Sequence, residues 1–206
     1  TQKSRTEVTY DAVKHVPAMS VTKSYAKDGT YLEESTTDFT QAVFDDAGQV
    51  VSGRLVTDVK RADGTQKSRT EVTYDAVKHV PAVSVTKSYA KDGTYLEEST
   101  TDFTQAVFDD AGQVVSGTLV TDVNRADGTQ KSHTEVTYDA VKHVPAVSVT
   151  KSYAKDGTYL EESTTDFTQA VFDDAGQVVN GTLVTDVKRA DGTQKSHTEV
   201  TYDAVK

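Results

Sequence analysis

The chain has 206 residues, a net charge of −10 at pH 7, no cysteine and no tryptophan. Binding to nucleic acids or to anionic membrane surfaces requires clustered Lys and Arg, so this acidic balance argues against both as partners. Without cysteine the chain has no disulfide, zinc–thiolate site or cysteine nucleophile. Apolar runs are short, as in Ala42-Val43-Phe44, and the sequence predicts no membrane span.

A unit of 64 residues recurs along the chain and accounts for nearly all of it. The segment TQKSRTEVTYDAVK begins at Thr1 and at Thr65, and it returns with His in place of Arg at Thr129 and Thr193. Three units and 14 further residues make up the length. A long regular repeat is typical of arrays, solenoids and propellers. A closed ring would divide one unit between its two ends, but this chain carries the same segment at both, which favours an open linear array.

The sequence His-Val-Pro-Ala occurs once in every unit, beginning at His15, His79 and His143. Proline disfavours continuation of a strand and restricts the residue before it, so we place the unit boundaries here. The resulting segments are the last strand of a truncated preceding unit and three whole units, at residues 1–14, 15–78, 79–142 and 143–206. Joints such as Ala76–Pro81 should be stiff, because proline limits φ and no Gly/Ser-rich linker intervenes.

Each unit is predicted to be all-β. Four extended runs are separated by turn sequences such as Asp28-Gly29 and Asp63-Gly64, in which glycine supplies the positive φ of a hairpin turn. Apolar and polar residues alternate within several runs, which indicates a sheet with one apolar face. The sequence thus predicts a linear array of near-identical units, each an antiparallel meander of about four strands built as a thin sandwich or a stacked sheet. The runs of the first unit are Ala18–Ala26, Thr30–Phe44, Gln49–Arg61 and Thr65–Val77.

The second run contains a segment, Glu33–Asp38, that is polar on both faces. The segment has no 3.6-residue apolar stripe, and its Ser-Thr-Thr lowers helix propensity, which argues against a helix. It is either a break between two short strands or part of a single-layer sheet that is wet on both sides. The pattern favours a strand with an interruption.

Acidic turn residues are the candidate metal ligands. Asp45-Asp46 and Asp109-Asp110 precede Ala-Gly in successive units and could offer oxygen ligands to Ca²⁺. Neither the EF-hand pattern nor the glycine-rich nonapeptide of calcium-binding β-rolls is present. Turn geometry is the alternative reason for these residues and the favoured one, so we expect no cofactor.

No residue pattern points to catalysis, and we expect a protein that is not an enzyme. Glu33 and Glu34 are adjacent on a strand and therefore point to opposite faces, so they cannot act together in glycoside hydrolysis. Glu34 and Asp38 share a face, but nothing in the sequence indicates a cleft. The histidines lack the spacing of metal ligands. Two of them replace arginine of other units, as surface residues do: His133 and His197.

Threonines are numerous on the expected strands. Thr-x-Thr rows on flat sheets can order water at an ice surface, but the spacing here is irregular and charged residues interrupt it. Exposed strands favour threonine in any case, which is the simpler interpretation. Near the start of the chain these residues are Thr6, Thr9, Thr22, Thr36, Thr37 and Thr40.

Two resemblances bear on function. Near-identical tandem β units, without cysteine and with acidic charge, resemble the tandem-repeat stalk regions of bacterial cell-surface adhesins, and this likeness of organisation covers the whole chain. Locally, Phe44-Asp45-Asp46-Ala47-Gly48-Gln49-Val50 and Thr73-Tyr74-Asp75-Ala76 resemble the tyrosine-aspartate (YD, or RHS) hairpin repeat. Phe44 stands where that motif has Tyr, and Gln49 stands where it has Arg.

The resemblance to adhesin stalks implies a structural spacer of a secreted or bacterial cell-surface protein, as in biofilms, that projects a distal binding domain not contained in this sequence. Its partners would be the neighbouring repeat units, and a host or cell-surface ligand would bind to the absent domains. The alternative is a repeated weak binding module for glycan, calcium or ice that acts by avidity. The sequence leaves open whether strands run along the array, at about 40 Å per unit, or across it, at about 19 Å.

Overall fold

The computed structural model describes residues 3–173 and 175–203. These residues form sixteen strands joined by turns, and they contain no helix that could cross a membrane. The chain divides into two compact units, residues 1–100 and 101–206, and the division falls within β8 (Tyr95–Asp102). Residues 1–2 of the expected first segment and residues 204–206 of the expected third repeat lie outside the described part.

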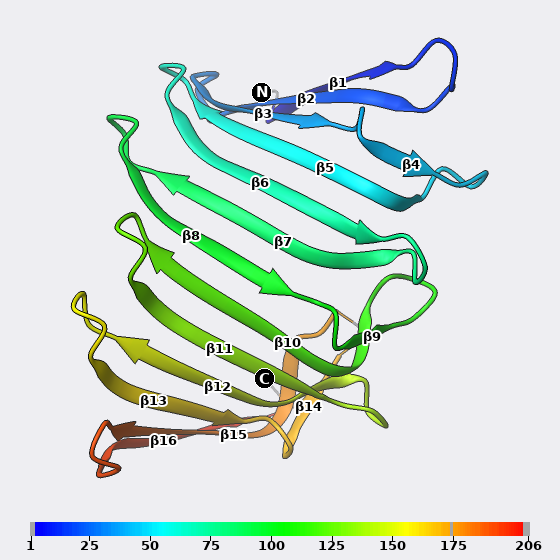
Figure 1. Ribbon diagram of the computed structural model, residues 1–206. Coiled ribbons are helices and arrows are strands. Elements are labelled where there is room, and N and C mark those ends of the chain that lie inside the picture. Colours follow the sequence, from blue (N-terminus) through cyan, green and yellow to red (C-terminus); the bar gives the residue numbers. More distant parts are fainter. Residues whose placement is uncertain (1–2, 174, 204–206) are drawn as a thin grey trace. The chain divides into compact units, whose positions relative to one another are not determined.

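The strands of the first compact unit form one antiparallel layer in which nearly every strand pairs with the next along the chain (Figure 1). The hydrogen-bonded order is β1-β2-β3-β5-β6-β7-β8, and the short β4 pairs with β5. The strands are β1 (Ser4–Tyr10), β2 (Pro17–Tyr25), β3 (Tyr31–Asp38), β4 (Ala42–Phe44), β5 (Val50–Arg61), β6 (Gln66–Asp75) and β7 (Val80–Tyr89).

The second compact unit has the same pattern. Its hydrogen-bonded order is β10-β11-β12-β13-β15-β16, with β9 on β10 and β14 on β15. The strands are β9 (Ala106–Phe108), β10 (Val114–Arg125), β11 (Gln130–Asp139), β12 (Val144–Tyr153), β13 (Tyr159–Asp166), β14 (Ala170–Phe172), β15 (Val178–Arg189) and β16 (Gln194–Tyr202).

The all-β antiparallel meander predicted from the sequence is confirmed. The sequence left open a thin sandwich or a stacked sheet. Each compact unit is a sheet of one layer and not a sandwich, because contacts between strands run almost wholly between hydrogen-bonded neighbours. β2 and β7 hold equivalent positions in successive repeats, and β3, β5 and β6 pair in order between them. The chain of the first unit therefore advances across its strands, by roughly 19 Å per repeat at the usual spacing of about 4.8 Å.

The interruption expected in the second run lies later than predicted. Glu33–Asp38 belongs to the continuous strand β3, and the break comes at residues 39–41. β3 pairs with residues 56–61 of β5 and β4 pairs with residues 50–53, so both pieces lie along β5. A polar segment can stand inside β3 because neither face of the strand is fully buried, so both alternating sets of side chains reach water.

A glycine on each long strand makes room for this break. Gly53, Gly117 and Gly181 hold equivalent positions, with φ of 88°, 87° and 85°. A Cβ on Gly117 would lie 2.0 Å from the carbonyl oxygen of Gln105, in the loop before β9. The same oxygen accepts a hydrogen bond from the N–H of Thr118 at 3.2 Å. A side chain at Gly117 would therefore require the paired backbone to move.

The sheet has almost no buried core. Among the described residues no side chain is fully buried, and the accessible surface of the chain is 12640 Å². A compact protein of 22.3 kDa would expose roughly 9,400 Å². The described residues that count as buried are Ala42, Val56, Ala106 and Ala170.

Pairs of aromatic rings pack against each other at both ends of β3. Tyr25 and Tyr31 face each other across the β2–β3 turn with ring centroids 5.8 Å apart, and Phe39 and Phe44 flank the break with centroids 6.1 Å apart. Such pairs contribute about 0.5–1.5 kcal/mol beyond the burial of their area. The later repeats have the equivalent pairs Tyr89–Tyr95, Phe103–Phe108, Tyr153–Tyr159 and Phe167–Phe172.

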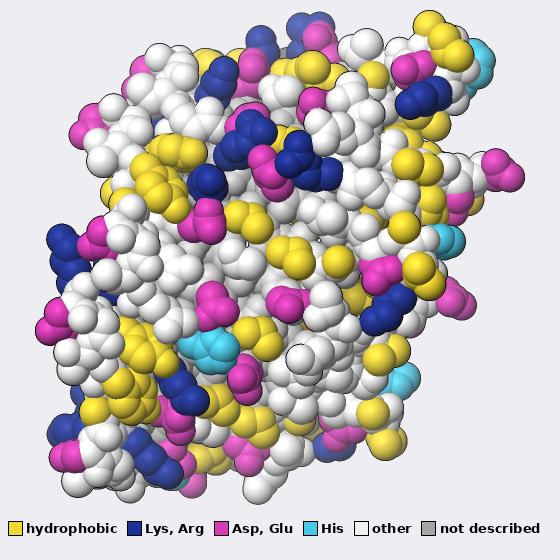
Figure 2. Space-filling model, viewed as in Figure 1, with side chains coloured by type: hydrophobic (Ala, Val, Ile, Leu, Met, Phe, Trp, Pro, Cys, Tyr) yellow, Lys and Arg dark blue, Asp and Glu magenta, His cyan; other side chains and the backbone are white. Residues whose placement is uncertain are grey.

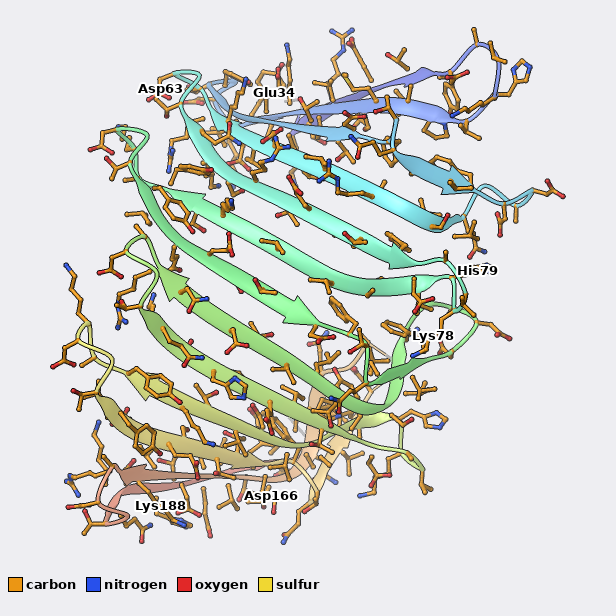
Figure 3. All side chains as sticks on the ribbon, in the orientation of Figure 1. Glu34, Asp63, Lys78, His79, Asp166 and Lys188 are labelled. Carbon is orange, nitrogen blue, oxygen red and sulfur yellow. The ribbon has the colours of Figure 1, made fainter. Side chains whose placement is uncertain are left out.

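The joint expected at Ala76–Pro81 is a turn within the sheet. Residues 76–79 close the hairpin between β6 and β7, and Pro81 lies inside β7, opposite Tyr74 at a shift in register. A bulge is one of the places where a sheet accommodates proline. His79 ends the turn with φ of 60°, and its N–H donates to the carbonyl of Asp75 at 2.8 Å (Figure 3). His15 and His143 have the same conformation, so this histidine has a role in the turn.

We expect the substitution Gly117→Ala to destabilise the chain more than Gly112→Ala. Both glycines have positive φ, of 87° and 76°, but only at Gly117 would a Cβ meet backbone atoms. Urea unfolding should show a loss of about 3 kcal/mol for Gly117→Ala and about 1 kcal/mol for Gly112→Ala. Equal losses would show that the close approach of Gln105 to this glycine has no effect on stability.

Candidate functional site

The four candidate calcium ligands lie in two equivalent hairpin turns, and two of them hold the turn together. A carboxylate oxygen of Asp45 accepts a hydrogen bond from the N–H of Gln49 at 2.8 Å. Asp109 accepts two such bonds, 3.0 and 2.8 Å long, from the turn that follows it. Asp46 and Asp110 are exposed. Within the described ranges, no three His, Cys, Asp or Glu side chains come together as a metal ion would need.

Other aspartates have the same role in their turns. Asp63, at the turn between β5 and β6, accepts from the hydroxyl of Thr65 at 2.6 Å and from its N–H at 2.9 Å (Figure 3). Asp75 accepts from the N–H groups of Lys78 and Val77 at 2.9 and 2.8 Å. These hydrogen bonds favour the charged carboxylates and hold the pKa of Asp63 and of Asp75 below its ordinary value. A good part of the acidic composition therefore serves the turns.

The acidic side chains of β3 have separate partners. Glu33 lies 2.6 Å from the Nζ of Lys67, and Glu34 lies 3.4 Å from the Nζ of Lys23 on the neighbouring strand β2. Asp38 accepts a hydrogen bond within the turn that follows it, at 2.8 Å. The structure thus places these carboxylates in ion pairs and a turn, and it does not bring them together.

One face of the first unit carries interleaved acidic and basic side chains over β5 and β6 (Figure 2). Arg69 lies between two carboxylates, with Nη1 2.9 Å from Asp58 and Nε 3.1 Å from Glu71. Arg54 also approaches Glu71, at 2.9 Å. Pairs this exposed contribute about 0–1 kcal/mol each. A shallow hollow of about 140 Å³ on this face is lined by Arg69, Glu71, Val85, Lys87 and Glu98.

Histidine replaces this arginine in the second unit and keeps its place. Nδ1 of His133 lies 2.8 Å from Asp122, and Nε2 lies 3.1 Å from Glu135. Hydrogen bonds to Asp122 and then Glu135 raise the pKa of His133 above its ordinary value. His197 on β16 has the equivalent arrangement. A surface exchange between repeats thus retains a cationic group, or one that can become cationic, between two carboxylates.

A further polar contact, which the sequence reasoning missed, comes from the arginine that ends each long strand. In the first unit, Arg61 donates through Nη1 to the carbonyl of Gln66 at 2.5 Å and through Nη2 to the carbonyl of Tyr89 at 2.6 Å. It therefore links β5 to the end of β7 across β6. Arg125 repeats this in the second unit. We call this contact the arginine clamp, and its one sequence signal is the unvarying run Arg-Ala-Asp-Gly.

Threonines form rows across the opposite face. In the first unit the side chains of β3, β5, β6 and β7 meet as successive cross-strand partners, Thr37, Thr57, Thr70 and Thr86. The hydroxyls of Thr37 and Thr57 lie 3.0 Å apart, and those of Thr70 and Thr86 lie 2.9 Å apart. The row was hidden in the sequence because alternate strands run in opposite directions through turns of unequal length.

No protein-family model matches the chain, and no curated protein matches it either. The interpretation of function therefore rests on the repeat and on the contacts between its strands.

The histidines predict a pH dependence with a definite sign. Their pKa is raised in the folded state above the unfolded value of about 6.5, so their stabilisation is full below that value and is lost as pH rises through the folded-state pKa. The groups around His133 are Asp122 and Glu135, with Lys151 as its cross-strand partner on β12.

We therefore expect the melting temperature of the native chain to fall as pH rises above about 6.5. The variant H133R/H197R is the matched control, because arginine stays charged throughout and already occupies this position at Arg69. Its melting temperature should fall less over the same range. Parallel curves for the two proteins would show that the histidines do not stabilise the sheet.

Proposed function

We propose that this chain is a non-catalytic spacer segment of a secreted or bacterial cell-surface repeat protein, similar in organisation to the stalks of adhesins. In this role it projects a distal binding domain that is not part of this sequence. The observation that carries the proposal is that strand pairing continues from one repeat into the next. β2 is joined to its counterpart β7 through the paired strands β3, β5 and β6. Each repeat therefore adds width to an existing sheet instead of forming a separate core.

Such growth suits a spacer because length then depends on the number of repeats. The residues that fix the geometry recur in every repeat: the turn aspartates, the positive-φ glycines of the long strands, and the arginines that end those strands. The net charge of −10 keeps neighbouring chains apart in solution. Neighbouring repeats are the expected partners within the chain.

The threonine rows favour one second candidate, a repeated weak binding surface for ice or another hydroxyl-rich ligand. The rows place hydroxyls at the spacing of neighbouring strands, about 4.8 Å. Several of these hydroxyls already bond to one another, as in the pair Thr70–Thr86 at 2.9 Å. Cross-strand threonine pairs of this kind stabilise sheets without any ligand, so the spacer remains the preferred function.

Small-angle scattering of this chain and of a chain lengthened by one copy of residues 143–206 tests the proposal. If repeats add strands sideways, the maximum dimension should grow by roughly 19 Å. A compact globule would grow much less in every dimension, because its radius of gyration would increase only from about 17 to about 18.5 Å. Growth on that small scale would exclude the spacer.

A further inference from the structure

The face that carries the threonine rows differs in charge from the opposite face. Over β5 and β6, which the structure describes in full, its side chains between the strand ends are all hydroxyl-bearing or apolar. Leu55 lies opposite Val72 there, beside the row that contains Thr57 and Thr70. We call this surface the threonine face, and its middle on β5 and β6 consists of Leu55, Thr57, Val59, Ser68, Thr70 and Val72.

The charged side chains of the threonine face lie near one end of the strands. Glu33 and Lys67 form an ion pair there at 2.6 Å, and Arg61 donates to backbone carbonyls. The ion pairs of Arg54 and Arg69 lie on the opposite face. The net charge of −10 keeps chains apart in most orientations, but a second chain can approach the middle of the threonine face without meeting a charge.

The differences between repeats avoid the threonine face. Five positions of the unit vary, and the side chains that form the middle of this face are the same in every repeat. Arg54 and Arg69 form ion pairs on the charged face, and Lys60 lies opposite Glu34 of that face. Changes of charge are therefore tolerated on one face, whereas the other stays constant, as a surface that fits a partner should. In the first repeat the variable positions are Met19, Ser52, Arg54, Lys60 and Arg69.

The hydroxyls of the threonine face already have partners. As in the first unit, the second unit has cross-strand pairs, with the hydroxyls of Thr101 and Thr121 3.0 Å apart and those of Thr134 and Thr150 also 3.0 Å apart. Covering a polar group is costly when it loses its hydrogen bonds to water without replacement. Because these hydroxyls bond to one another, a dry surface can cover them at a lower cost.

The exposed area is large enough for a stable contact. The accessible surface of 12640 Å² exceeds that of a compact protein of this mass by roughly 3,200 Å². The seven paired strands of the first unit span about 34 Å, and six residues along each span about 20 Å, so the threonine face of this unit covers roughly 670 Å². This is close to the area of about 800 Å² that each partner contributes to a specific interface.

We propose that the threonine face binds the threonine face of a second copy of this chain. The two sheets stack about 10 Å apart, with both charged faces turned outward to water. Every folded copy presents this face, so the contact requires no strand to leave its own sheet. Most of the side chains brought together carry hydroxyls, so stacking adds little apolar core to either chain. The pairing does not depend on the spacer role.

Sedimentation equilibrium of the full chain over a range of concentrations tests the proposal. The mass should rise from 22.3 kDa toward twice that value. The variant T121R/T185R puts arginine in the middle of the threonine face and should weaken the dimer at least about 100-fold, because the charge is buried without a partner.

The matched control is T118R/T182R, which makes the same change on the same two strands but on the charged face, where Arg54 stands in the first repeat. It should form dimers as the native chain does. A chain that stays monomeric would overturn the proposal, as would a dimer that both variants weaken equally or that neither weakens.

A second measurement does not depend on how well the arginine variants fold. The chain has no cysteine, so Thr121→Cys and Thr118→Cys each place a single thiol on one face. When about nine tenths of the chains are dimeric, alkylation by a maleimide should be about 10-fold slower at position 121, because the monomer alone exposes that thiol. The rate at position 118 should not change with concentration. A rate at position 121 that is equally independent of concentration would overturn the proposal.

Discussion

Hydrogen bonding between neighbouring strands, in a register that recurs with every repeat, is the interaction on which the rest of this structure depends. Most soluble domains bury a large apolar core, but here the described buried residues are three alanines and a valine. The free energy of folding must therefore come from many small contributions along the strands, such as ring pairs, threonine pairs and ion pairs. The turn aspartates and the positive-φ glycines of the long strands recur at equivalent positions, so these contributions repeat along the chain.

Local chemistry made the strands and turns predictable. Asp-Gly turns and alternating residues indicated four runs whose positions agree closely with β2 to β6, because hairpin geometry is set by a few neighbouring residues. For the polar segment Glu33–Asp38 the sequence left two interpretations open, and the favoured one, a break, was wrong: the segment is continuous strand with neither face fully buried. Pro81 was expected to end a strand, but a bulge accommodates it within β7.

Contacts between distant strands could not be predicted in this way. The clamp from Arg61 to Tyr89 joins residues 28 positions apart, on strands that are not neighbours. The threonine row depends on the register of four strands, which turn lengths alone did not reveal. Asp45 and Asp109 make turn hydrogen bonds of the kind that the sequence favoured for them, since the bonds of an aspartate to its own turn are local.

The heat capacity change on unfolding, measured by calorimetry, tests the central claim most directly. Globular proteins show about 12–15 cal/mol/K per residue, because unfolding exposes the apolar surface of a core. A sheet held by strand pairing, with so few buried residues, should give clearly less, below about 10 cal/mol/K per residue. A value in the usual range would contradict this account, because it would require a buried apolar core that a single open sheet does not have.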